Sequence, residues 1–262
     1  NQQAGLFSGL IVASMMGCTI VFSIPVGLSL IEKRDQPYFA QGLLIGLITI
    51  PIGSILGGAI AGYDMGMVFV NSIPVIIIAV LLALGLKLIP NGMIKGCIVF
   101  GKAIVVIVTA GLAAAAFQEM TGVVIIPGMS PISEALGIIG AIGVVLLGTF
   151  PILSLLTKAL DKPLSAIGKK IGLDPTSTAG IIFTLANSIP VYKLMKNMSS
   201  LGKIMNTSWL VPATAALGDH LGFTAGVYPE AISAVVISKI IAGFLALLLA
   251  FLLTKNTDAL DK

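Results

Sequence analysis

Charged side chains are scarce in this chain of 262 residues. Only 10% of the residues are Asp, Glu, Lys or Arg, whereas 57% are hydrophobic, and the mean hydropathy is +1.09. So few charges could not cover the water-facing surface of a soluble domain of this size, and so many apolar residues do not suit a disordered chain. The composition therefore predicts a polytopic membrane protein.

Residues that carry enzymatic chemistry are scarce as well. His220 is the only histidine, and the two cysteines, Cys18 and Cys97, lie in or beside apolar runs without the spacing of a metal or redox site. No GxSxG, HExxH, Walker A or GxGxxG fingerprint occurs with the strand and helix context that it needs. We therefore expect a transporter and not an enzyme, with no catalytic residue, no metal site and no cofactor.

Long apolar runs divide the sequence into candidate membrane helices. About 20 apolar residues cross a bilayer as a helix. Seven runs reach about that length, at residues 4–31, 38–63, 67–86, 97–118, 135–157, 204–227 and 231–254. A shorter eighth run, 175–192, is interrupted near its end by Asn-Ser-Ile-Pro. These runs predict an all-α polytopic fold with about seven transmembrane helices.

The basic residues predict the orientation of these helices. If the seven long runs cross and run 175–192 does not, one side receives every Lys and Arg except Lys239. The other side then receives only acids, namely Asp64, Glu119, Glu134 and Glu230. Cytoplasmic loops carry an excess of Lys and Arg, so the basic side is expected in the cytoplasm. A crossing by 175–192 would move basic residues outside, and we therefore predict a re-entrant helical hairpin there.

The tetrapeptide Ser-Ile-Pro-Val occurs three times, at residues 23–26, 72–75 and 188–191. Proline removes an amide donor and frees the carbonyl four residues earlier. We predict a kink or break at each copy, with related breaks at Pro51 and Pro151. Interrupted helices at membrane depth often mark a transporter's binding site, because half-helix ends present dipoles and unpaired backbone groups to the cargo. Bending for packing alone is the alternative at each position.

Asp219-His220 is the only adjacent acid and histidine in the chain, and Gly218 and Gly222 lie close by on either side. A carboxylate in a low-dielectric setting attracts a cation far more strongly than it would in water. Ionisable residues within a membrane segment are candidate functional residues. Asp219 could therefore bind a cation, and His220 could orient the carboxylate or relay a proton. The alternative is an internal pair that only fixes a break in the helix.

Other polar side chains at membrane depth could complete a small binding site: Asn71, Asn187, Ser188, Asn206, Thr207, Trp209, Thr214, Thr19 and Ser23. Trp209, the only tryptophan, could hold an ammonium group by a cation–π interaction. Its alternative role is an interfacial anchor near Lys203. Lys239 would be costly in a span without a partner, which could be Asp219 or a group on a neighbouring helix.

Three stretches carry a resemblance to a known family. They are ASMMGCTIVFSIP at residues 13–25, TLANSIP at 184–190 and ALGDHLGF at 216–223. In these the chain resembles the bacterial ethanolamine-utilisation permeases along its whole length. Members of that family extend further at the N-terminus. We therefore expect a single transmembrane transporter domain over residues 1–262 that lacks an N-terminal portion.

The resemblance implies a multi-pass protein of the bacterial inner membrane that brings ethanolamine into the cytoplasm. Ethanolamine is mostly an ammonium ion at neutral pH, so it needs a carboxylate or aromatic face and a partner for its hydroxyl. We expect Asp219 to bind the ammonium, and Asn187, Ser188 or Asn71 to bind the hydroxyl. The alternatives are a carrier for another small amine or alcohol and a membrane scaffold subunit. Membrane lipid is the other expected partner and nucleic acid is not; homo-oligomer formation stays open.

Overall fold

The structure, a computed structural model, describes residues 2–254, with the backbone alone at some positions between 2 and 7 and between 138 and 161. Every regular element in this part of the chain is a helix. Within it, five helical stretches are long and apolar enough to cross a membrane: Ser8–Leu30, Gln36–Ile60, Met65–Leu88, Pro90–Thr121 and Pro229–Thr254. The predicted all-α polytopic membrane fold is confirmed.

The first helical stretch changes its winding in the middle. Helix α1 (Gln2–Val12) leads into two π-helical turns, η1 (Ala13–Gly17) and η2 (Thr19–Ser23), and then into α2 (Ile24–Leu30). A π-helical turn widens the helix and alters which carbonyls are paired, and such turns are frequent at functional sites. The first Ser-Ile-Pro-Val copy begins at the end of η2, so the helix there is distorted but not interrupted.

Four long helices follow, namely α3 (Gln36–Ile60), α4 (Met65–Leu88), α5 (Pro90–Thr121) and α6 (Ile132–Lys170). Their ends are marked locally. Asp64 accepts a hydrogen bond from the Met67 amide at 2.9 Å and caps α4. Pro90 occupies the first position of α5, and Gly122 ends that helix with φ of 73°.

The C-terminal part is built from shorter pieces. It contains α7 (Pro175–Ala186), α8 (Ile189–Leu194), η3 (Met195–Asn197), α9 (Ser200–Ala213), α10 (Asp219–Val227), η4 (Pro229–Ala231) and α11 (Ile232–Thr254). The predicted run 204–227 is thus not one helix but is divided between α9 and α10. Run 135–157 lies inside the longer α6. The number of seven crossings stays a prediction.

Only one Ser-Ile-Pro-Val copy interrupts its helix. Asn187 and Ser188 separate α7 from α8, whereas α4 runs through Pro74. Helices α3 and α6 likewise run through Pro51 and Pro151, so the breaks predicted there are wrong. A break in lipid leaves backbone groups unpaired unless other protein groups satisfy them. The break between α7 and α8 finds such partners.

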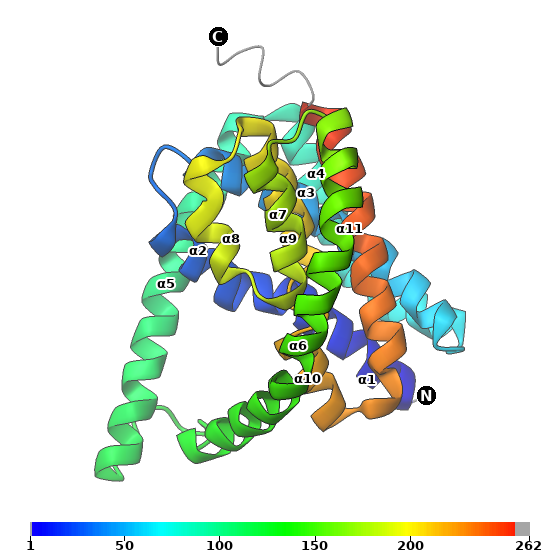
Figure 1. Cartoon of the computed structure of the whole chain (residues 1–262). Helices are drawn as coiled ribbons and strands as arrows, with labels where there is room; N and C mark the ends of the chain where they lie inside the picture. The colour runs from blue at the N-terminus through cyan, green and yellow to red at the C-terminus, as the bar shows by residue number, and fades with distance from the viewer. Residues whose placement is uncertain (1, 255–262) are drawn as a thin grey trace.

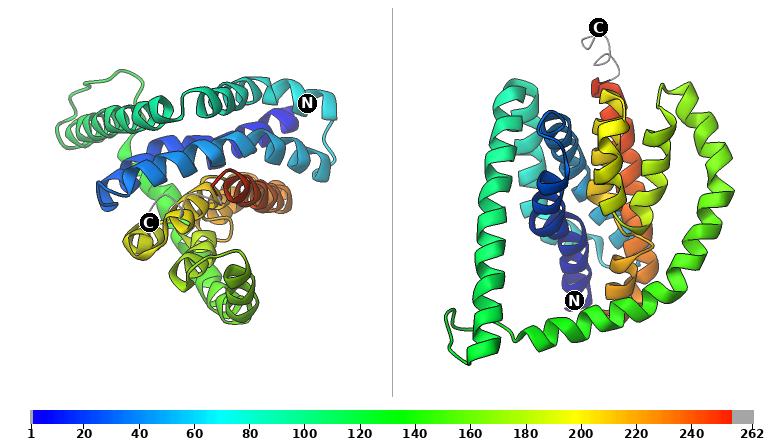
Figure 2. Two further views of the ribbon diagram at one scale, coloured as in Figure 1. Left: turned by 90° about the horizontal axis from the view of Figure 1, so that it is seen from above. Right: turned by 60° about the vertical axis from the view of Figure 1, so that its left-hand side comes forward.

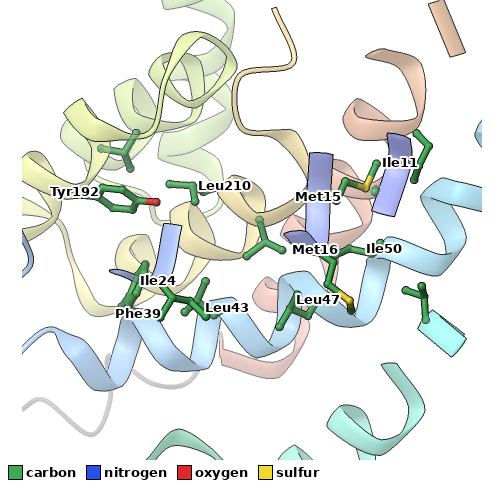
Figure 3. Close-up of a cluster of buried hydrophobic side chains, with 14 of the residues drawn as sticks. Ile11, Met15, Met16, Ile24, Phe39, Leu43, Leu47, Ile50, Tyr192 and Leu210 are labelled. Atoms are coloured by element: carbon green, nitrogen blue, oxygen red, sulfur yellow. The ribbon is translucent and has the colours of Figure 1, made fainter. Parts of the chain in front are cut away.

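Helices α3, α9 and α11 form the centre of the molecule, and they approach one another through glycines. A Cβ atom on Gly42 would lie 2.5 Å from Thr207 Cβ, and one on Gly46 would lie 2.5 Å from Val211 Cβ. Small residues allow this close packing, which stabilises helix pairs where hydrophobicity alone cannot. Figure 3 shows the adjoining apolar cluster, with Ile24, Phe39 and Tyr192 toward one side and Ile11, Met15 and Met16 toward the other.

Two long helices flank this centre. Figure 2 shows α5 upright on one side, while α6 runs beneath the central helices and then curves upward along the other side. Helices α7 and α8 lead from and back to the same end of the molecule, the end at which α9 begins (Figure 1). This path is the one expected of the hairpin 175–192, and its re-entrant position in a membrane stays a prediction.

A buried ion pair joins two helices at the end of the molecule where α9 begins. Lys203 Nζ lies 2.8 Å from Asp35 Oδ1, and the ammonium stands 5.3 Å from the centroid of the Tyr38 ring. Asp35 immediately precedes α3, and Lys203 belongs to the first turn of α9. The pair therefore links the start of α3 to the start of α9, on the side where the basic residues gather.

Candidate functional site

The two helix breaks of the C-terminal part lie against each other. The Ala215 amide donates to the Thr184 carbonyl at 2.8 Å, and the Leu217 amide donates to the Leu185 carbonyl at 2.9 Å. The segment between α9 and α10 thus donates hydrogen bonds to two carbonyls near the end of α7. Its own residues follow a turned, non-helical path. Ala215 has φ of 52°, a left-handed conformation that this pairing holds in place.

Gly218 permits the crossing. A Cβ atom at this position would lie 2.1 Å from the Ala186 carbonyl oxygen, far inside van der Waals contact. Any other residue would push the α7 end away from the start of α10. The glycine before Asp219 is therefore explained by the close approach of two backbones.

A small cavity of about 10 Å³ lies at this crossing. Its lining residues come from η2 and the residue before it, from both helix breaks and from the start of α10: Cys18, Phe22, Asn187, Ser188, Thr214, Ala215, Asp219 and His220. Five of the predicted site residues are thus brought together: Asp219, His220, Asn187, Ser188 and Thr214. A space of this size is about that of one water molecule. The cavity therefore has room for about one water molecule.

Asp219 opens α10 and carries the acidic group of the cavity. Its Oδ1 atom is buried and has no hydrogen-bond partner in the part of the chain that the structure describes. The positive end of the α10 dipole lies beside it and favours its negative charge. His220 follows directly, and its Nδ1 atom is likewise buried without a partner among residues 2–254. Both groups have unused capacity to bind a ligand.

Lys239 approaches the same place from α11. It is completely buried, and its Nζ atom donates to the Ser14 carbonyl of η1 at 3.2 Å. It interacts electrostatically with Asp219 and Cys18. No direct ion pair joins Lys239 to Asp219 among the described residues. The lysine therefore uses a neighbouring helix as its hydrogen-bond partner.

Thr19 and Ser23 lie on η2, and both are fully buried. The Thr19 hydroxyl donates to the Met15 carbonyl at 2.6 Å and is thereby occupied. The Ser23 hydroxyl has no partner of good geometry in the described part of the chain, and neither has the Tyr192 hydroxyl, which lies beside Ser23 and Ser188. Sequence reasoning missed Tyr192, although it lies only four residues after Ser188 in the break between α7 and α8.

Asn71 and Trp209 lie elsewhere. Asn71 is exposed on α4. The Trp209 indole donates to the Ile181 carbonyl at 2.9 Å, and its ring packs edge-on against Phe244 at 5.3 Å between centroids. The ring lines an apolar cavity of about 410 Å³ formed by α6, α7, α9 and α11, and the lining residues that the structure describes include no charged one. These two residues do not join the Asp219 cavity.

A second cavity of about 210 Å³ adjoins the small one. It is lined by Leu10, Ala13, Ser14, His220, Phe223 and Thr224. His220 belongs to the lining of both cavities, so its ring lies between them. Its lining residues belong to α1, η1 and α10, and α1 and α10 lie toward the end of the molecule opposite the start of α9 (Figure 1).

A buried carboxylate at the crossing of two interrupted helices, in a fold of long apolar helices, is the arrangement of a polytopic α-helical membrane transporter. The sequence comparisons agree with this class. The family model "Ethanolamine utilisation protein, EutH" matches residues 1–253, and the chain belongs to this family.

Several curated relatives are similar to this chain. The "Probable ethanolamine permease EutH" of Listeria monocytogenes is 48% identical over 94% of this chain and 66% of its own length. The protein of the same name from Escherichia coli K12 is 44% identical over 98% of this chain and 68% of its own length. An "Uncharacterized protein YxeR" of Bacillus subtilis is 43% identical over 99% of the chain. The chain thus spans about two thirds of the length of these permeases. No solved structure matches it.

Proposed function

We propose that this protein is a transporter or facilitator that carries ethanolamine, as its ammonium ion, through the bacterial inner membrane into the cytoplasm. Membership of the EutH family and the permease names of its relatives support this cargo. The observation that carries the proposal is the Asp219 carboxylate, which is buried with an unpartnered oxygen where two helix breaks cross.

Asp219 is the proposed partner of the ammonium group. A charged amine loses its water shell on entering a membrane site, and a carboxylate is the group that best replaces it. The Asp219 Oδ1 atom, which has no partner among the described residues, can accept hydrogen bonds from the cargo. His220 lines the same cavity beside it. The proposed role of His220 is to orient the carboxylate or to relay a proton.

Asn187 and Ser188 are the proposed partners of the alcohol group. Both line the same cavity as Asp219. The Asn187 side-chain oxygen accepts the Ile189 amide at 2.8 Å, so the carboxamide NH₂ is the part of this side chain that can donate to the cargo. Ser23, whose hydroxyl is unpartnered in the described chain, is a further candidate at the edge of the site.

The cargo must open the site in order to enter it. The small cavity of about 10 Å³ is smaller than any amine, whereas the adjoining cavity of about 210 Å³ can hold one. We therefore place the approach of ethanolamine in the larger cavity, with a movement of His220 admitting it to Asp219. Because the basic residues lie at the opposite end, this approach is from outside the cytoplasm.

Uptake of radiolabelled ethanolamine into cells without another route tests the proposal. Mildly acidic medium keeps the freely diffusing neutral amine scarce. The full-length protein should show saturable uptake, and Asp219→Asn should lower its apparent affinity about 30-fold or more, since truncating a buried charge pair costs about 2 kcal/mol or more.

The matched control is Asp64→Asn, an acid-to-amide change at an exposed helix cap, which should leave uptake unchanged at equal membrane abundance. A wild-type protein without uptake above background would refute ethanolamine as the cargo. Normal uptake by Asp219→Asn would refute the carboxylate as its binding group and would suit a packing role for the Asp219-His220 pair.

A further inference from the structure

Lys239 is the one charged residue of α11 within the described chain, and its surroundings are unusual for a cation. Its side chain is completely buried in the middle of a helix of 23 residues. An ammonium group has three hydrogen-bond donors, but the single acceptor recorded for Lys239 among residues 2–254 is the Ser14 carbonyl, at 3.2 Å. The lysine can neither extend to water nor complete its hydrogen bonds where it is.

Among the described residues, the titratable groups that interact with Lys239 come from two other segments. Asp219 and His220 belong to α10, and Cys18 lies between η1 and η2. Asp219 is the only acid among them. Lys239 and Asp219 thus balance each other's charge without a direct ion pair, and each retains unused hydrogen-bonding capacity among the described residues.

Binding of an ammonium ion would upset this balance. A second cation would then share one carboxylate with Lys239 in a region of low dielectric, where repulsion between like charges is strong. A lysine at position 239 can relieve this repulsion by releasing a proton. An arginine there could not, because a guanidinium keeps its proton.

We propose that Lys239 is the resident cation of the Asp219 site and releases one proton for each ethanolammonium bound. This inference rests on the proposed cargo. The ammonium of Lys239 becomes a neutral amine, the cargo takes over the counter-ion role beside Asp219, and the proton leaves through the cavity that Ser14 and His220 line. When the cargo departs toward the cytoplasm, Lys239 takes up a proton again from that side. Over the cycle one ethanolammonium enters, one proton exits, and no net charge crosses.

Titration calorimetry of ethanolamine binding to the purified full-length protein tests this inference. Repeating the titration near neutral pH in buffers of different ionisation enthalpy gives the number of protons released per ligand bound. The wild type should release about one proton per ligand. Lys239→Met, which is close in volume, should still bind ethanolamine and release close to none.

Two further variants test whether a removable charge at position 239 is what matters. Lys239→Arg should weaken binding about tenfold or more, because its charge cannot be removed. Lys193→Met, an exposed basic position on α8, should behave as the wild type. Elution of each variant as a single folded species in size-exclusion chromatography guards against misfolding.

The outcomes separate the two proposals. Binding by the wild type without proton release would overturn the role of Lys239 alone, and so would release of about one proton by Lys239→Met, since Asp219 or His220 would then be its source. A wild type that shows no saturable ethanolamine binding would count against the proposed function itself.

Discussion

At the scale of single residues, two neighbours contribute to the site in different ways. Asp219 carries its carboxylate, whereas Gly218, which has no side chain, lets the backbones of α7 and α10 approach each other. The Ala186 carbonyl oxygen lies 2.1 Å from where a Cβ atom of residue 218 would stand. Because the contacted atom belongs to the backbone of α7, it cannot move aside as a flexible side chain would.

Gly218→Ala is therefore expected to destabilise the protein by about 1–3 kcal/mol, as overpacking of a tight contact does, and to abolish saturable ethanolamine uptake by separating the two breaks. Melting temperature in detergent and uptake at matched abundance measure the two effects. Gly226→Ala in α10, where a Cβ atom would meet nothing within 4 Å, should show neither effect. Wild-type behaviour of Gly218→Ala would mean that α7 and α10 do not approach so closely.

At the scale of helices, Asp174 connects two elements that carry the site. Its carboxylate accepts hydrogen bonds from the Ser177 amide at 2.8 Å and from the Ser199 amide and hydroxyl at 3.0 Å each, besides the Ser177 hydroxyl. It thereby caps α7 and holds the residue that caps α9. Partial burial raises the pKa of Asp174, but these hydrogen bonds to the charged form outweigh it and leave the pKa below its ordinary value of 3.8.

A depressed pKa in the folded protein gives a stabilisation that is present above the unfolded value and is lost as the pH falls through the folded one. Asp174→Asn should therefore lower the melting temperature at neutral pH, and the difference from the wild type should shrink below about pH 4. Thermal unfolding in detergent across this range measures it, with Asp64→Asn as the comparison. A difference that stays constant with pH would show that the charge of Asp174 is not what links α7 to α9.

At the scale of the whole molecule, the distribution of charge and the path of the chain agree. The connections at residues 31–35 and 195–199 lie at the end near residue 254, and residues 122–131 and 228–231 lie at the opposite end (Figure 1). The first set carries basic residues, and Glu230 lies in the second. The positive-inside rule therefore predicts a cytoplasmic position for the first set.

Single cysteines test this orientation. In a protein with Cys18→Ala and Cys97→Ala, a membrane-impermeant maleimide should label Ser130→Cys in intact cells and label Asn197→Cys only after permeabilisation. Both positions are exposed; Ser130 lies between α5 and α6, and Asn197 ends the short η3 between α8 and α9. Labelling of Asn197→Cys in intact cells would show that run 175–192 crosses the membrane and is not re-entrant.

The sequence by itself determined the class of this protein and the positions of its long helices. Both depend on local composition, because a run of about 20 apolar residues must pair its own backbone in lipid and does so as a helix. The family followed from three short stretches in the same way. The Asp219-His220 pair was also evident locally, since acid and histidine are so rare elsewhere in the chain.

Only the tertiary structure decided which residues gather around that pair. A helix surrounded by lipid and by other apolar helices is apolar all round, so its sequence does not indicate which face meets a neighbour. The sequence therefore could not distinguish Asn187 and Ser188, which line the Asp219 cavity, from Asn71 and Trp209, which do not. A proline likewise breaks a helix only where other backbone groups satisfy the freed ones, as Ala215 and Leu217 do for α7.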